Sequence, residues 1–76
     1  MGDSSAPSDV EQRGLSAARG KIRAARARLA DHQLLGIDDV VEAAVSYLVP
    51  VRAEHRAAVD DDIAALREEI EAARQA

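Results

Sequence analysis

The side chains best suited to catalysis in this sequence are two histidines and two serines: His32, His55, Ser16 and Ser46. A serine nucleophile needs a base within hydrogen-bond reach and an oxyanion-binding group, usually supplied by a strained turn or a glycine-rich loop. All four residues fall in sequence typical of helices or helix ends, and the four glycines of the chain are scattered. The sequence therefore predicts no catalytic residue, no bound cofactor, no small-molecule substrate and no enzymatic activity.

One cluster contains side chains that bind metal ions: Glu54, His55 and the consecutive aspartates Asp60, Asp61 and Asp62. Helical ligands must lie three or four residues apart to share a face. His55 lies neither three nor four residues from any of the three aspartates. Three consecutive acids on a helix also point in three different directions. The chain also lacks the Asp-rich loop with a central glycine that binds calcium. We therefore expect no metal site.

The composition limits the scaffold that can position these side chains. Of the 76 residues, 17 are alanine and 17 are Leu, Ile or Val, while Phe, Trp and Cys are absent. Such a chain can form thin, alanine-lined helical seams but not a bulky core, and it cannot use disulfides for support. A domain this short buries only about 60% of its unfolded surface. These features favour an all-α protein that gains stability by association.

Charge is divided unevenly along the chain. Residues 13 to 28 carry six basic side chains and no acid, whereas residues 31 to 76 carry eleven acids and four arginines. The two halves can neutralise each other between helices or can bind a charged partner. No apolar run reaches the roughly 18 residues of a membrane span, and the polar N-terminus lacks the features of a signal peptide. We expect a soluble, cytoplasmic protein that makes no membrane contact.

The first helix is predicted over residues 9–34, after a disordered tail formed by residues 1–8. Ser8 and Glu11 have the spacing of a capping box, in which each side chain bonds the other residue's backbone N–H. Gly36 is expected to end this helix in the left-handed conformation. A repeat of three and four residues marks a coiled-coil seam, formed by Leu15, Ala18, Ile22, Ala25 and Leu29.

Two further helices are predicted, over residues 39–49 and 50–75, in the same single domain (9–76). Asp39 has the position of an N-cap, with Glu42 three residues later. Pro50 lacks a backbone N–H, so either a new helix begins there or one long helix kinks. The last helix carries a second seam of apolar residues, formed by Val59, Ile63, Leu66 and Ile70.

The two seams predict a helical hairpin of the first and last helices, with the short helix as a brace, and two hairpins assembling as a four-helix-type coiled-coil dimer. Charged residues flank the seams as a rim: Arg19, Lys21, Arg26 and Arg28 on the first helix, and Asp62 and Glu69 on the last. Opposite charges at such positions favour antiparallel or intermolecular pairing of these helices. We therefore expect a homo-oligomer, most simply a homodimer, with the seam residues at its interface.

The function expected from these patterns is protein–protein interaction: a small dimerisation module, adaptor or regulator that binds a partner protein through its helical surface. The alternative is an antitoxin-like or repressor-like regulator that binds nucleic acid through its basic first helix. The basic side chains lie on both sides of the seam, the net charge is −4, and the basic half has no aromatic residue to stack on bases. These observations favour protein interaction.

Two segments are similar to helices of known families. Residues 36–48, Gly-Ile-Asp-Asp-Val-Val-Glu-Ala-Ala-Val-Ser-Tyr-Leu, resemble the second helix of ribbon-helix-helix repressors and antitoxins, which read the major groove with a preceding β-strand. Here the preceding stretch is rich in Arg and Ala and is predicted to be helical. Residues 40–55 are similar to a C-terminal helix of tryptophanyl-tRNA synthetases, but none of that family's nucleotide-binding motifs is present. Neither resemblance is used to assign a family.

Overall fold

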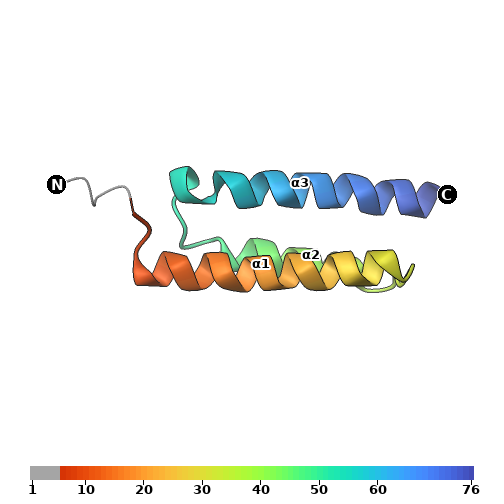
Figure 1. Ribbon diagram of the computed structural model, residues 1–76, viewed down its shortest axis with the longest axis horizontal. Coiled ribbons are helices and arrows are strands. Elements are labelled where there is room, and N and C mark those ends of the chain that lie inside the picture. The colour runs from red at the N-terminus through yellow and green to blue at the C-terminus, as the bar shows by residue number, and fades with distance from the viewer. Residues whose placement is uncertain (1–5) are drawn as a thin grey trace.

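The computed structural model describes residues 6–76, which form three α-helices and no strand: α1 (Asp9–Ala30), α2 (Ile37–Tyr47) and α3 (Ala53–Gln75). The helices lie side by side in a rod of 51 × 16 × 16 Å (Figure 1). The all-α class predicted from the sequence is confirmed. Of the predicted N-terminal tail, residues 1–5 lie outside the described residues.

The start of α1 is the predicted capping box. The backbone N–H of Glu11 donates to the Ser8 hydroxyl at 3.2 Å, and the backbone N–H of Ser8 donates to Glu11 Oε1 at 2.9 Å. Two of the N–H groups that a helix start leaves without intrahelical partners are thereby satisfied. Glu11 and Asp9 also put negative charge in the first turn, where the helix dipole favours it.

The end of α1 differs from the prediction. The helix stops at Ala30, four residues early, and the residue in the left-handed conformation there is His32 (φ 58°). The turn is closed by a backbone bond from the N–H of Gln33 to the carbonyl of Arg28, at 2.8 Å. This bond satisfies the carbonyl of Arg28, which lies in the last turn of the helix. In the predicted helix, which continued to residue 34, that carbonyl lay in the helix interior. Gly36 is left-handed (φ 77°) as expected, but it precedes α2.

The other two helices also begin elsewhere than predicted. α2 starts at Ile37 and not Asp39, with Gly36 as its N-cap and no side-chain capping bond. α3 starts at Ala53 and not at Pro50, because Arg52 takes an extended conformation (φ −67°, ψ 150°) at the N-cap. The choice left open at Pro50 is thus decided: residues 48–52 separate two helices.

The pairing of the helices corrects the predicted hairpin. Short connections reverse the chain twice, so α2 runs antiparallel to α1, and α3 runs parallel to α1 (Figure 1). Within one chain the hairpin is therefore formed by α1 and α2, and the expectation that the first and last helices form it is wrong. Assembly into a dimer or coiled coil remains a prediction.

The core lies along the axis of the rod, where all three helices meet. It contains Leu15, Ala18, Ile22 and Ala25 from α1, Ile37, Val41 and Ala44 from α2, Leu48 and Val51 from the connection, and Val59, Ile63, Leu66 and Ile70 from α3. Small residues bring α1 and α2 into close contact. A Cβ atom on Gly14 would lie 2.5 Å from the carbonyl oxygen of Tyr47, so only glycine fits there.

Candidate functional site

The residues predicted for an oligomer interface are largely used inside the single chain. Leu29 is half-buried against the core. The other eight are buried: Leu15, Ala18, Ile22, Ala25, Val59, Ile63, Leu66 and Ile70. A second chain can therefore reach this seam only along its outer edge, and any interface must be built mainly from the residues beside it.

The predicted charged rim is partly assembled by the fold. Arg26 donates to both carboxylate oxygens of Glu69, at 2.8 and 3.0 Å, and so joins α1 to α3. Arg28 donates to the backbone carbonyl of Leu35 at 3.4 Å. Arg19 and Asp62 border one hollow between α1 and α3. Lys21 is half-buried on α1.

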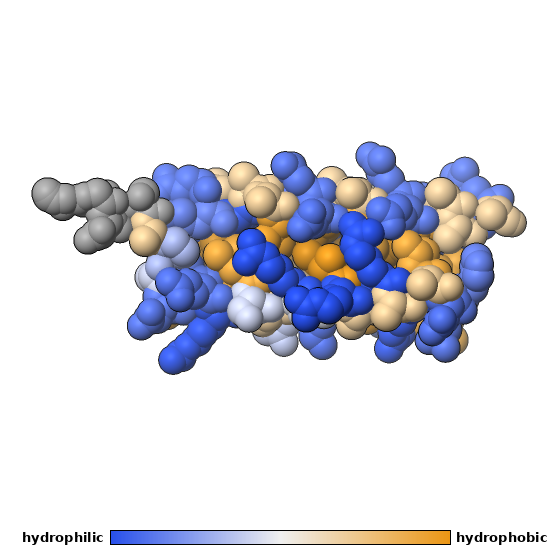
Figure 2. Space-filling model, in the orientation of Figure 1, coloured by the Kyte–Doolittle hydropathy of each residue, from blue (hydrophilic) through white to orange (hydrophobic). Residues whose placement is uncertain are grey.

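The structure reveals a basic row that the predicted rim does not contain, because Arg23 is not among the predicted rim residues. Arg19, Arg23 and Arg26 are four and three residues apart, so they lie along one face of α1. They border the hollow next to Asp62 together with the edge of Ile22. In residues 6–76, Arg19 and Arg23 make no ion pair. Figure 2 shows strongly hydrophilic side chains over a hydrophobic strip between α1 and α3.

A complementary row runs along α3. Its members are all exposed and share the same three-and-four spacing: Ala58, Asp62, Ala65, Glu69 and Ala72. Glu69 fixes this row on the side of α1, since it bonds Arg26. The opposite edge of α3 faces α2, where Arg67 bonds Glu42 at 3.3 Å and Arg74 bonds Asp38. We call the two rows, Arg19–Arg23–Arg26 and the five α3 residues, the α1/α3 face.

Among residues 6–76, Glu11 is the one charged residue that is buried. Its hydrogen bonds extend well beyond the capping box. Oε2 accepts from the backbone N–H of Arg52 at 2.9 Å and from His55 Nδ1 at 3.0 Å. The Arg52 backbone N–H, followed by that of Ser8 and by the His55 ring, holds the pKa of this carboxyl well below its usual range. One carboxylate thus connects the N-terminal ends of α1 and α3.

His55 was expected at the edge of the seam, but no sequence pattern connects it to Glu11, 44 positions away. The sequence signal for the role of Glu11 is the capping-box spacing, which predicts the bond from the backbone N–H of Ser8 to one carboxylate oxygen and no bond to the other oxygen. The His55 and Glu11 side chains are only 8% and 6% exposed, so a substrate has little access to them. Their arrangement joins helices and does not resemble an acid–base pair in an open cleft.

A second surface lies where α1 begins and α2 ends. It is a hollow of about 360 Å³, here called the Tyr47 hollow, lined by Val10, Arg13, Gly14, Ala17, Ser46, Tyr47 and Pro50. Large apolar side chains are exposed at or beside it: Val10 by 59%, Tyr47 by 41% and Val49 by 78%. The sequence analysis missed this hollow, because it depends on the close approach of α1 and α2 at Gly14.

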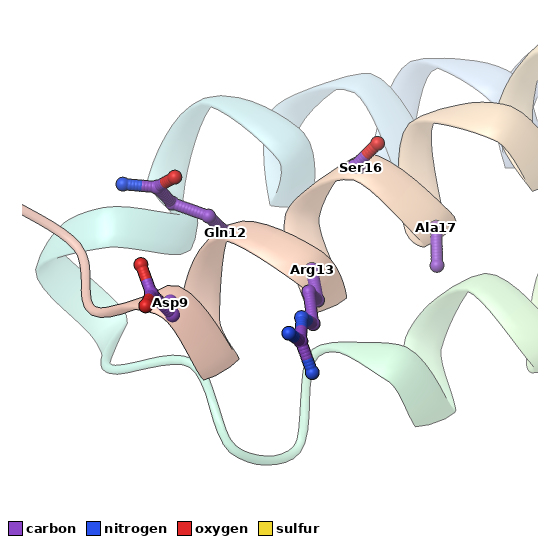
Figure 3. Close-up of a pocket in the computed structure, with 5 residues that line it drawn as sticks. All are labelled: Asp9, Gln12, Arg13, Ser16 and Ala17. Carbon is purple, nitrogen blue, oxygen red and sulfur yellow. The ribbon is translucent and has the colours of Figure 1, made fainter.

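Another depression lies on the outer side of α1 and is lined by Asp9, Gln12, Arg13, Ser16 and Ala17 (Figure 3). All five residues belong to one helix, and their side chains diverge. Arg13 points toward the segment that joins α2 to α3, whereas Ser16 points to the other side of α1 (Figure 3). The depression therefore brings no nucleophile and base together.

Residues 6–76 contain no group of three His, Cys, Asp or Glu side chains placed to hold a metal ion. None of the helices in this described part is long and apolar enough to cross a membrane. The helix α1 occupies the position where a ribbon-helix-helix protein would have its strand. No protein-family model matches the chain, and no curated protein or solved structure is significantly similar to it.

Proposed function

We propose that this protein is a non-catalytic protein–protein interaction module, a small dimerisation, adaptor or regulatory protein, whose α1/α3 face binds first a second copy of the chain. The observation that supports this most directly is the pair Arg19 and Arg23, which have no acidic partner within residues 6–76 yet lie beside Asp62. Cations on one helix and acids on its neighbour make the face complementary to itself.

A two-fold axis parallel to the rod uses this complementarity. Because α1 and α3 run parallel within the chain, such an axis lays α1 of one copy parallel on α3 of the other. The Arg26–Glu69 pair sets those residues at one level, so Arg19 and Asp62, each seven residues earlier, also share a level. Because this axis leaves the level along the rod unchanged, it brings Arg19 to Asp62 of the second copy, and Arg26 to Glu69 of that copy.

The rod is 51 Å long and 16 Å wide, so α1 and α3 offer a second copy an elongated side. The exposed alanines of the α3 row let a second helix approach closely, while the rim charges set its direction. The result is a four-helix contact with intermolecular pairing of α1 and α3, built from residues beside the seam.

The same basic row also bears on the nucleic-acid alternative. Arginines on one face are the arrangement that contacts phosphates. However, Asp62 borders the same hollow and Glu69 already pairs with Arg26, so a phosphate backbone would meet acids as well as arginines. Binding to random duplex DNA should accordingly be weak or absent at physiological ionic strength.

Two charge-reversed chains test the dimer. Variant A carries Arg19→Glu and Arg23→Glu, and variant B carries Asp62→Arg. Each alone brings like charges together across the two-fold axis and should sediment as a monomer at concentrations where the parent is a dimer. An equimolar mixture pairs the acidic α1 of A with the altered α3 of B, so it should recover dimers. Circular dichroism of each variant establishes that the helices persist.

Three results would overturn the proposal. One is a parent that sediments as a monomer and melts at a temperature independent of concentration at micromolar levels. Another is a mixture of A and B that remains monomeric while both variants are folded. The third is tight binding of random DNA by the parent, with a steep salt dependence that variant A loses, which would favour the nucleic-acid alternative.

A further inference from the structure

The loop between α1 and α2 presents one leucine outward and buries its neighbour. Leu35 is 95% exposed, whereas Leu34 packs against the core. Two hydrogen bonds hold the loop in place: the backbone N–H of Ile37 donates to the carbonyl of Leu34 at 3.1 Å, and the Arg28 guanidinium donates to the carbonyl of Leu35. The Leu35 side chain is therefore held in solvent, where a second molecule can reach it.

The Tyr47 hollow lies at the opposite end of the rod. The α1–α2 connection, which carries Leu35, is at one end, and the α2–α3 connection, which borders the hollow at Pro50, is at the other (Figure 1). Leu35 cannot therefore reach the hollow of its own chain. The hollow is apolar at Val10, Ala17 and Tyr47, and its volume of about 360 Å³ accommodates a leucine side chain.

The charges at the two ends are opposite in balance: near Leu35 the two acids Asp31 and Asp39 outnumber one cation, Arg28, whose guanidinium bonds the Leu35 carbonyl. Arg13 is the cation that lines the hollow. Asp31 and Asp39 are exposed on either side of Leu35 in the sequence. None of these three side chains makes an ion pair within residues 6–76. A contact between the ends of two copies would bring the free arginine to the free acids.

We propose that the Tyr47 hollow binds Leu35 of a second copy, with Arg13 facing Asp31 and Asp39 of that copy. This contact goes beyond the α1/α3 dimer and uses none of its residues. The leucine and the hollow are different surfaces, so a pair of molecules joined in this way still has one free leucine and one free hollow. The association is therefore head-to-tail and continues along a row of molecules. A single leucine anchor makes a small interface, and we expect it to form at concentrations well above those of the dimer.

Sedimentation at rising concentration, up to the millimolar range, tests the contact. The parent should pass from dimers to larger species, and Leu35→Ser should stop at dimers. Arg13→Glu should also stop at dimers. Adding Asp39→Arg in the same chain exchanges the two charges and should restore association into larger species. The matched control is Glu68→Arg, a charge reversal at an exposed residue outside both surfaces. This variant should associate into larger species as the parent does.

The two interfaces are separated by combining changes. With Arg19→Glu and Arg23→Glu present, the chain should lose the α1/α3 dimer but still associate end to end, until Leu35→Ser is added. Growth of the folded Leu35→Ser variant equal to that of the parent would overturn the proposal, as would a parent that never exceeds two copies. Neither result bears on the α1/α3 dimer, which is judged at low concentration.

Discussion

The carboxylate of Glu11 lies 3.0 Å from Nδ1 of the His55 ring, and this contact joins the first turn of α1 to the first turn of α3. The same carboxylate accepts from the backbone N–H of Ser8 and from that of Arg52, the N-cap residue of α3. A single acidic side chain therefore satisfies donors at the starts of two helices that are parallel in space and far apart in sequence.

Replacing Glu11 by Gln should lower the melting temperature by several degrees at pH 7, because the neutral amide accepts these hydrogen bonds more weakly than a carboxylate. The folded-state pKa of Glu11 is lowered, so its stabilisation is complete above the ordinary glutamate pKa of about 4.3. It is lost progressively as the pH falls below that value. The difference in melting temperature between parent and variant should accordingly shrink in acid.

A matched control for this prediction is Glu68→Gln, which changes an exposed carboxylate that makes no ion pair in the described residues. Its melting temperature should follow that of the parent at every pH. If Glu11→Gln melted like Glu68→Gln at pH 7, the assigned role of Glu11 at the two helix starts would be wrong.

Gly14 and Gly20 should respond in opposite ways to replacement by alanine. Alanine favours a helix interior over glycine by about 1 kcal/mol. At Gly20 nothing lies within 4 Å of an added Cβ atom, so the free energy of unfolding should rise by up to that amount. At Gly14 the Cβ would lie 2.5 Å from the Tyr47 carbonyl oxygen, so the helices must separate and stability should fall. Urea denaturation of the two variants, side by side, measures both changes.

Leu66 is fully buried among the three helices, and Leu66→Asp should unfold the protein, because an unpaired carboxylate there loses its hydration. The milder Leu66→Ala should cost about 2–5 kcal/mol. Glu68→Arg, two residues further along α3 and exposed, should change stability by less than about 0.5 kcal/mol. Equal damage from Glu68→Arg in thermal melts would contradict the placement of α3.

The Arg26–Glu69 pair should contribute modestly to the packing of α1 on α3. Both side chains are nearly half exposed, so solvent screens them, and Arg26→Gln should cost from a few tenths to about 1 kcal/mol. The cost should diminish in high salt, because the parent's pair is then screened further. Denaturation at low and high ionic strength gives the comparison, and a salt-independent cost would indicate packing by the arginine stem.

The sequence alone determined the helical class, because the three-and-four spacing of residues such as Ile22, Ile63 and Leu66 is a local property of one helix face. It also determined the capping box, since Ser8 and Glu11 are three residues apart. Of the nine predicted seam residues, eight are buried and Leu29 is half-buried. Helix ends were less well predicted, because the bond that closes α1 at Arg28 and Gln33 uses backbone atoms that any side chain permits.

Only the tertiary structure decided which helices pair and in which direction. Periodicity identifies the apolar face of a helix but not the neighbour that covers it. The seam of α1 was therefore assigned to the last helix and to a second chain, whereas α2 and α3 of the same chain bury it. Glu11 and His55 lie on different helices, and so do the residues around Tyr47 that line the hollow. The basic row completed by Arg23 depends on which face of α1 the other helices leave open. The Tyr47 hollow, for example, depends on how closely α1 and α2 approach at Gly14, a distance that no local pattern encodes.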